Sequence, residues 1–248
     1  MRKRWAILAG TLLLPSMALA GELTNPALSV PATGKFAFGV EYFFSNGDFK
    51  PSSPGFGKIS ADSEQIYARG AYSAFDGNEV FVKLGGADFV TRRAFEDNSA
   101  FEPGFDTSVA AGVKQSFEVM PNIRIGGILQ YAYFSDYAWS KTMNVTSGNV
   151  TQDLKAASPW QADAALAATY VGDGWAPYIG PMMSWRRFDW HDVRSGAETS
   201  NRSTTYSESE LAGGFIGLDF WRGSMKGTLE VQFSSEESAG LTFSYLFP

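Results

Sequence analysis

The sequence predicts an all-β fold, an antiparallel up-and-down transmembrane β-barrel of about ten strands, with eight or twelve strands as the alternatives. Three observations lead to this fold. Large apolar residues recur at every second position in about ten segments, long and short connections alternate between those segments, and the chain opens with an export signal. Beyond that signal no apolar run approaches roughly 18 residues, so we expect no membrane-spanning helix.

Residues 1–20 have the pattern of a secretory signal peptide. The basic Arg2-Lys3-Arg4 precedes an apolar stretch, and Ala18-Leu19-Ala20 forms a cleavage site. We expect residues 21–34 to be a short periplasmic segment and residues 35–248 to be the barrel. The chain has no Cys, which excludes a lipoprotein anchor and disulfides and, for an exported chain, points to the bacterial envelope.

The mature chain is acidic. Removing the three basic residues of the signal from the 20 Lys and Arg leaves 17 against 26 Asp and Glu, a net charge of −9. An acidic surface argues against nucleic acid as a partner.

The period-two pattern is clearest in the first and last expected strands. Every second residue from Phe36 to Phe44 is large and apolar, and the final segment repeats this from Leu241 to Phe247. Alternate side chains of a strand share one face, so each of these strands has a continuous apolar face. Pro177 and Pro181 suggest an irregular seventh strand with a bulge. The other expected strands are 62–75, 79–89, 105–119, 122–139, 158–171, 176–190, 207–221 and 225–236.

The connections alternate in length. Tight turns of two to four residues alternate with polar loops of roughly 14 to 18 residues at 46–61, 90–104, 140–157 and 191–206. Barrels that span the outer membrane have this asymmetry, with tight turns on the periplasmic side and long loops outside. The 140–157 connection could also extend a hairpin beyond the membrane.

The tryptophans fit two aromatic girdles. Trp139, Trp160 and Trp190 lie where strands meet long loops, whereas Trp175 and Trp221 lie at tight turns. Aromatic side chains gather at both interfaces of a membrane barrel.

The last strand should pair with residues 35–45, because a sheet in lipid cannot leave an edge unpaired. Its "GLTFSYLF" resembles the C-terminal assembly signal of bacterial outer-membrane β-barrel proteins, and residues 34–248 resemble the small barrels of that type. The chain departs from the signal in ending on Pro248. The resemblance implies a Gram-negative outer membrane, export through the secretory pathway, contact with outer-membrane lipid and lipopolysaccharide, and assembly machinery that reads 239–247. We expect a monomer.

The polar faces place charges of both signs inside the barrel. Buried charges persist when they are paired and hydrogen-bonded, so this balance favours a lumen filled by ion pairs over a pore lined by one sign. The main ion-pair candidates are Glu41, Arg69, Lys83, Lys114, Arg124, Asp219 and Glu230. The same rule places Glu118, Asp136, Asp163, Arg186 and Lys226 inward.

Three functions are compatible with this interior. The barrel could have a structural role in the envelope or conduct small solutes passively through a narrow, largely ion-paired lumen; it could be a surface adhesin acting through its outer loops; or it could be a protease. The third rests on Asp189-Trp190-His191, which resembles the Asp-x-His of the omptin outer-membrane proteases and would make Asp189 and His191 the catalytic candidates. Omptins also need a D-x-D pair in an earlier loop, where this chain has Glu96-Asp97. Because that set is incomplete, we do not expect an enzyme. A single His and no Cys argue against a metal or other cofactor.

Overall fold

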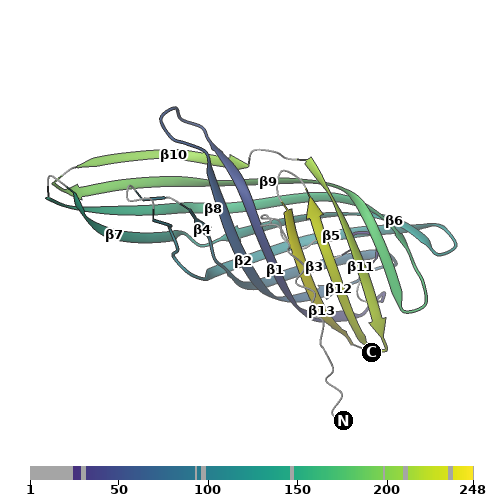
Figure 1. Ribbon diagram of the computed structural model, residues 1–248. Helices are drawn as coiled ribbons and strands as arrows, with labels where there is room; N and C mark the ends of the chain where they lie inside the picture. The colour runs from purple at the N-terminus through teal and green to yellow at the C-terminus, as the bar shows by residue number, and fades with distance from the viewer. Residues whose placement is uncertain are drawn as a thin grey trace, which may run out of the picture.

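The computed structural model is all-β and forms a closed, strongly tilted barrel (Figure 1). No helix in its described part is long and apolar enough to cross a membrane. The expected signal peptide lies outside that part. The structure describes residues 25–28, 32–92, 94–95, 99–145, 148–197, 199–208, 212–233 and 237–247.

Within the described residues, ten strands pair in one antiparallel ring, and the short β4 (Val90–Thr91) lies beside it. The ring runs in chain order, as an up-and-down barrel requires. It comprises β1 (Phe36–Pro51), β2 (Ile59–Tyr72), β3 (Asn78–Ala87), β5 (Asp106–Met120), β6 (Ile123–Phe134), β8 (Gly148–Tyr170), β9 (Trp175–Gly196), β11 (Ala212–Arg222), β12 (Met225–Phe233) and β13 (Glu237–Leu246).

The first and last strands close the ring. Ala37 of β1 lies opposite Leu246 of β13, and the register continues to Ser45 opposite Ser238. This pairing confirms the expected closure by residues 35–45. It leaves neither of these strands with an unpaired edge in lipid.

The outside of the barrel is apolar and its inside is polar. On β1, Phe36, Phe38 and Val40 are exposed, whereas Glu41 and Phe43 are buried. A soluble protein would cover such a continuous exposed apolar surface, so the ring belongs in a bilayer. The chain is an outer-membrane β-barrel.

Aromatic residues mark the two edges of the apolar surface. At the tight-turn end Tyr170 lies 5.7 Å from Trp175, and at the other end Tyr131 stacks on Trp160 at 6.1 Å between ring centroids. Ten residues of a strand tilted by about 40° rise about 25 Å, the height of the apolar band in such barrels. Two girdles are therefore present. Trp190 does not belong to them, because its side chain is 6% exposed and points inward. Trp139 does not belong to them either, because it lies on β7 (Tyr137–Val145), beyond the barrel rim.

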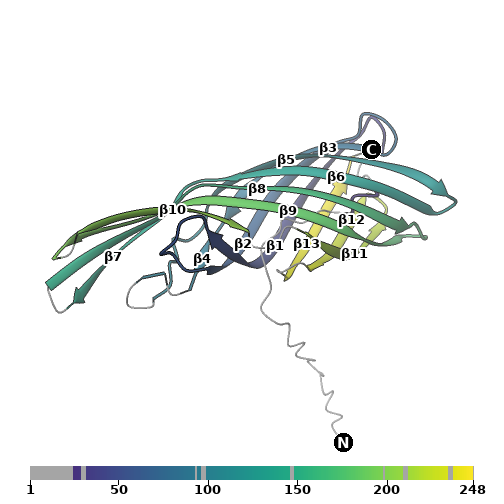
Figure 2. The same cartoon turned by 90° about the horizontal axis from the view of Figure 1, so that it is seen from above.

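Four strands continue past the barrel rim as a sheet, which we call the outer sheet (Figures 1 and 2). It consists of β7 (Tyr137–Val145), β10 (Ser200–Glu208) and the parts of β8 and β9 paired with them. Residues 140–157 therefore form a hairpin that extends beyond the membrane, the alternative to a polar loop at this connection. The expected loop at 191–206 is wrong, since β9 and β10 occupy most of it.

The register shifts on β8 and, between Glu118 and Met120, on β5, and not at Pro177 or Pro181. The register of β9 with β11 runs without a shift past Pro177, whereas the pairing of β8 with β9 shifts between Ala157 and Trp160. Ser158 takes a positive φ of 50° there, as bulges allow.

Candidate functional site

The centre of the lumen holds a network of five charged side chains, which we call the ion-pair belt. Glu41 lies 3.1 Å from Arg69 and 2.7 Å from Lys83, and Glu79 contacts Arg69 and lies 3.4 Å from Lys114. All five are at most 4% exposed. They come from the inward faces of β1, β2, β3 and β5, which are neighbours in the ring, so the alternation of the strands brings them together.

Phe81 fills the space beside the belt. Its ring centroid lies 4.6 Å from the guanidinium carbon of Arg69, 5.3 Å from the Lys83 ammonium and 6.0 Å from that of Lys114. The ring face attracts these cations, which outnumber the two carboxylates of the belt by one. The belt and the Phe81 ring therefore pack against each other inside the lumen.

A second network lies nearer the tight turns. The Asp219 carboxylate pairs with Lys226 at 2.9 Å and accepts hydrogen bonds from Thr228 at 2.6 Å and from the Asn25 side-chain amide at 2.8 Å. Asn25 also donates to Thr169 at 3.4 Å. Asn25 thereby links β11 and β8, the two strands on either side of β9.

Residues 25–28, which we call the inner segment, lie inside the barrel. The Asn25 side-chain oxygen accepts a hydrogen bond from the Ala27 backbone N–H, a turn that fixes the segment's shape. The inward face of β6 has Gly126 where the segment passes, and a Cβ there would lie 2.5 Å from the Pro26 carbonyl oxygen. The residues expected only to precede the barrel on the periplasmic side thus fill its tight-turn end.

Two further polar groups link the other walls. Glu230 accepts from the Tyr178 hydroxyl at 2.8 Å and from Gln232 at 2.6 Å. Asp163 accepts from Gln130 and Gln161, both at 2.8 Å. Each of these buried carboxylates accepts hydrogen bonds from its own strand and from another strand, as buried charge requires.

The outer end of the lumen is closed by aromatic rings, which we call the aromatic cap. Phe89 lies between Phe188 and Tyr137 at 5.0 and 5.7 Å, and Phe101 lies 5.2 Å from Trp190, in geometries that aromatic pairs prefer. Phe89 and Phe101 come from the connection between β3 and β5, which folds inward. The cap consists of Phe49, Phe89, Phe101, Tyr137, Phe188, Trp190 and Tyr206.

The structure brings together most of the predicted lumen residues. Glu41, Arg69, Lys83 and Lys114 form the belt, and Asp219, Glu230, Asp163, Lys226 and Arg186 are also buried in the lumen.

Three residues lie elsewhere. The Arg124 guanidinium is at the tight-turn rim, 4.0 Å from Glu118, whose side chain is 60% exposed, and Asp136 pairs on the surface with Lys155 at 2.6 Å. Glu118 keeps the parity of Lys114 and Ser116 but lies at the open, tight-turn end of β5, and Asp136 lies between β6 and β7, outside any strand.

The sequence reasoning missed Glu79, the inner segment and the aromatic cap. Glu79 follows directly on the turn Asp76-Gly77-Asn78, so its place on the inward face was not apparent. Glu79 stands two residues before Phe81, so the alternation of the strand predicts that both side chains point inward.

The catalytic candidates stand on the outer sheet. Asp189 and His191 are both partly exposed, on the face opposite to Trp190. Asp189 accepts a hydrogen bond from Thr205 at 2.7 Å, and His191 lies in register with Lys155 and Ser203. Asp189 and His191 share one surface of the outer sheet with the hydroxyl residues Thr205 and Ser203. Glu96 and Asp97 lie outside the described residues. The described residues contain no group of three or more His, Cys, Asp or Glu side chains suited to a metal ion.

No protein-family model matches the sequence, and no curated protein matches it. Solved structures resemble its barrel. The translocator domain of the autotransporter NalP from Neisseria meningitidis aligns with 87% of this chain and 90% of its own at 10% identity and a TM-score of 0.41. An outer-membrane channel from Pseudomonas putida F1 aligns with 87% of this chain and 96% of its own, at 12% identity and a TM-score of 0.43. The attachment protein Ail of Yersinia pestis aligns with 87% of this chain and 100% of its own, at 12% identity and a TM-score of 0.31. At these values the likeness carries no argument about the site.

Proposed function

We propose that this protein is a closed outer-membrane barrel whose activity resides in the outer sheet, as a surface recognition or adhesion protein. The observation that supports this most is the succession of aromatic cap, ion-pair belt and inner segment along the lumen. A solute would have to displace each layer in turn. Eight-stranded barrels are filled by side chains, and at ten strands this chain is close to that size.

The outer sheet is a large exposed platform. Nine-residue strands β7 and β10 flank the extensions of β8 and β9, and Trp139 and Val193 are each 37% exposed there. In the described residues β7 pairs with β8 alone, so one edge of the sheet is open to a further strand. Open edges and exposed aromatic side chains are common features of protein recognition surfaces.

The same proposal includes its biogenesis. The alternating apolar face from Leu241 to Phe247 supports recognition of residues 239–247 by the barrel-assembly machinery, after export through the secretory pathway. The folded protein is then a monomer. Replacing Phe247 by Ser should reduce the folded, heat-modifiable form in outer-membrane fractions.

Planar-bilayer conductance of the refolded full-length mature chain tests the closed lumen. We expect no stable open channel. A steady conductance in the unmodified protein would refute the closed barrel and favour the small-solute channel.

A shortened outer sheet tests its role in recognition. Trp139 and Leu154 lie opposite each other, so residues 140–153 can be replaced by Asn-Gly, which forms a tight hairpin turn. At equal amounts of folded protein, cells with this variant should adhere less to host-cell or biofilm surfaces than cells with the full chain. Equal adhesion would show that β7 and the tip of β8 are not the recognition surface. A separate assay tests the protease: peptide cleavage by the purified protein, abolished by Asp189→Ala or His191→Ala, would favour it.

A further inference from the structure

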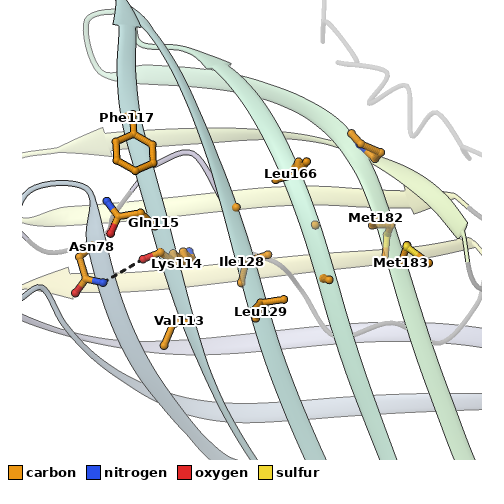
Figure 3. A pocket seen from close by; sticks show the side chains of 14 residues that line it. Asn78, Val113, Lys114, Gln115, Phe117, Ile128, Leu129, Leu166, Met182 and Met183 are labelled. Carbon is orange, nitrogen blue, oxygen red and sulfur yellow. Dashed lines mark hydrogen bonds between the residues drawn. The ribbon is translucent and has the colours of Figure 1, made fainter.

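The lipid-facing wall formed by β5, β6, β8 and β9 is hollowed. Three adjoining hollows of about 620, 520 and 470 Å³ follow one another along it, each within the roughly 300–1,000 Å³ of ligand sites. The first shares Leu129 with the second and Leu166 with the third, so they form one channel, which we call the furrow. Figure 3 shows its middle, with Phe117, Leu129, Leu166 and Met183 around it.

Small residues cause the furrow. Where other strands carry Phe, Val or Leu outward, the outward positions here include Gly127, Ala162, Ala164 and Ala168. From Ala168 to Ala162 the furrow is about 20 Å long at the usual rise per strand residue. Its lining is almost entirely apolar, so a hydrocarbon chain fits it.

The upper end of the furrow meets a cation at the membrane surface. Trp185 lines that end, and the next outward residue of β9 is Arg187, which is exposed and lies in register with Trp160 of the girdle. Across the part of the chain that the structure describes, no ion pair holds the Arg187 guanidinium. The next outward residue of β9 is Asp189, whose carboxylate accepts a hydrogen bond from Thr205. Beyond it stand His191 and Lys155, and Lys155 is already paired with Asp136, so Arg187 is the cation that remains for a ligand.

We propose that the furrow and Arg187 form a binding site for lipopolysaccharide, with one acyl chain in the furrow and a lipid A phosphate on the guanidinium. Arginine binds phosphate through two parallel hydrogen bonds. The site faces the outer leaflet, because Arg187 lies on the side of the outer sheet, opposite to the tight turns. The chemistry of the occupant follows from this combination of an apolar channel and a cation at one end.

Native mass spectrometry of the refolded mature chain in detergent tests the site, with deep-rough lipopolysaccharide, phosphatidylglycerol or inorganic phosphate added. Lipopolysaccharide should bind at one copy per chain. Arg187→Gln should weaken it by roughly ten- to a hundredfold, the usual effect of losing a hydrogen bond between charged groups. Arg222→Gln, at the tight-turn rim, is the matched control and should bind as the unmodified chain does.

A second pair of variants tests the furrow. Ala164→Phe fills it and should weaken lipopolysaccharide binding at least tenfold, whereas Val40→Phe, outward on β1 and away from the furrow, should not. Equal binding by Arg187→Gln or by Ala164→Phe overturns the proposal. So does equal affinity for phosphatidylglycerol, which would indicate a general lipid groove, or a dimer that Ala164→Phe disrupts, which would indicate a second copy in the furrow. None of these readouts depends on conductance or adhesion, so the site and the proposed function can fail separately.

Discussion

Replacing Glu79 by Gln should destabilise the barrel strongly, because Glu79 is one of two carboxylates among five charges in the ion-pair belt. Its removal leaves three cations, Arg69, Lys83 and Lys114, with Glu41 as the remaining anion. At an effective dielectric constant of about 20, unit charges 3.4 Å apart attract by about 5 kcal/mol. Removing one partner of a buried pair costs about 3–5 kcal/mol, and we expect that loss in the free energy of unfolding.

The assay is urea unfolding of the refolded protein in lipid vesicles, followed by tryptophan fluorescence and by heat-modifiable gel migration. The loss should appear as a lower urea concentration at the unfolding midpoint, while the slope of the unfolding free energy against urea concentration stays the same. Arg124→Gln is the matched control. Its partners at the rim are 60% and 91% exposed, so we expect a loss of about 0–1 kcal/mol. Lys114→Met added to Glu79→Gln should restore part of the stability, because it removes one orphaned cation.

A loss below about 1 kcal/mol for Glu79→Gln would refute the reasoning. It would mean that water solvates the belt and that the lumen is open at this depth. Altered ion selectivity in bilayers would then be expected as well.

Three further predictions follow from other parts of the lumen and the surface. Trp190→Ala removes a buried ring from the aromatic cap and should cost about 3–5 kcal/mol in the same urea assay, whereas a girdle position would cost far less. Gly126→Val places side-chain atoms where Pro26 lies, so it should expel the inner segment, seen as faster proteolysis near the N-terminus of the folded barrel; unchanged proteolysis would contradict the packing. Hydrogen bonds from the Lys155 ammonium and the Ser158 N–H lower the pKa of Asp136, so its stabilisation is present above the unfolded-state pKa and is lost as pH falls through the folded-state pKa. The melting temperatures of Asp136→Asn and the unmodified protein should therefore differ by a degree or two at neutral pH and converge in acid.

Period-two alternation predicted the ring, because each barrel strand separates a lipid face from a polar one. The same rule gave Glu41, Arg69, Lys83 and Lys114, which stand in mid-strand where parity is unambiguous. Alternation could not predict the position of Trp190, because an aromatic residue at a strand end is equally compatible with an aromatic girdle and with a cap inside the lumen. The strands of the outer sheet were missed at 191–206 because water reaches much of their surface, so no strict alternation of apolar and polar residues marks them.

The inner segment could not be foreseen for a different reason. Asn25 and Ala27 belong to no strand, and their place depends on Asp219 and Gly126, which are far away in the sequence. Local patterns hold no information about such a contact.

The closing pair of strands constrains the order in which this protein can form. Ala37 and Leu246 are neighbours in the sheet although their positions are 209 residues apart in the sequence. Bringing such distant segments together carries a high loop-closure entropy and gives the barrel a high contact order, which slows folding. A nascent chain that has reached residue 230 therefore cannot yet complete any stable part of the wall in lipid, because both edges of the growing sheet are open. Membrane insertion is then an all-or-none event that awaits the final ten residues, and a frameshift or premature stop near the C-terminus should yield an exported, unfolded chain for the periplasmic proteases.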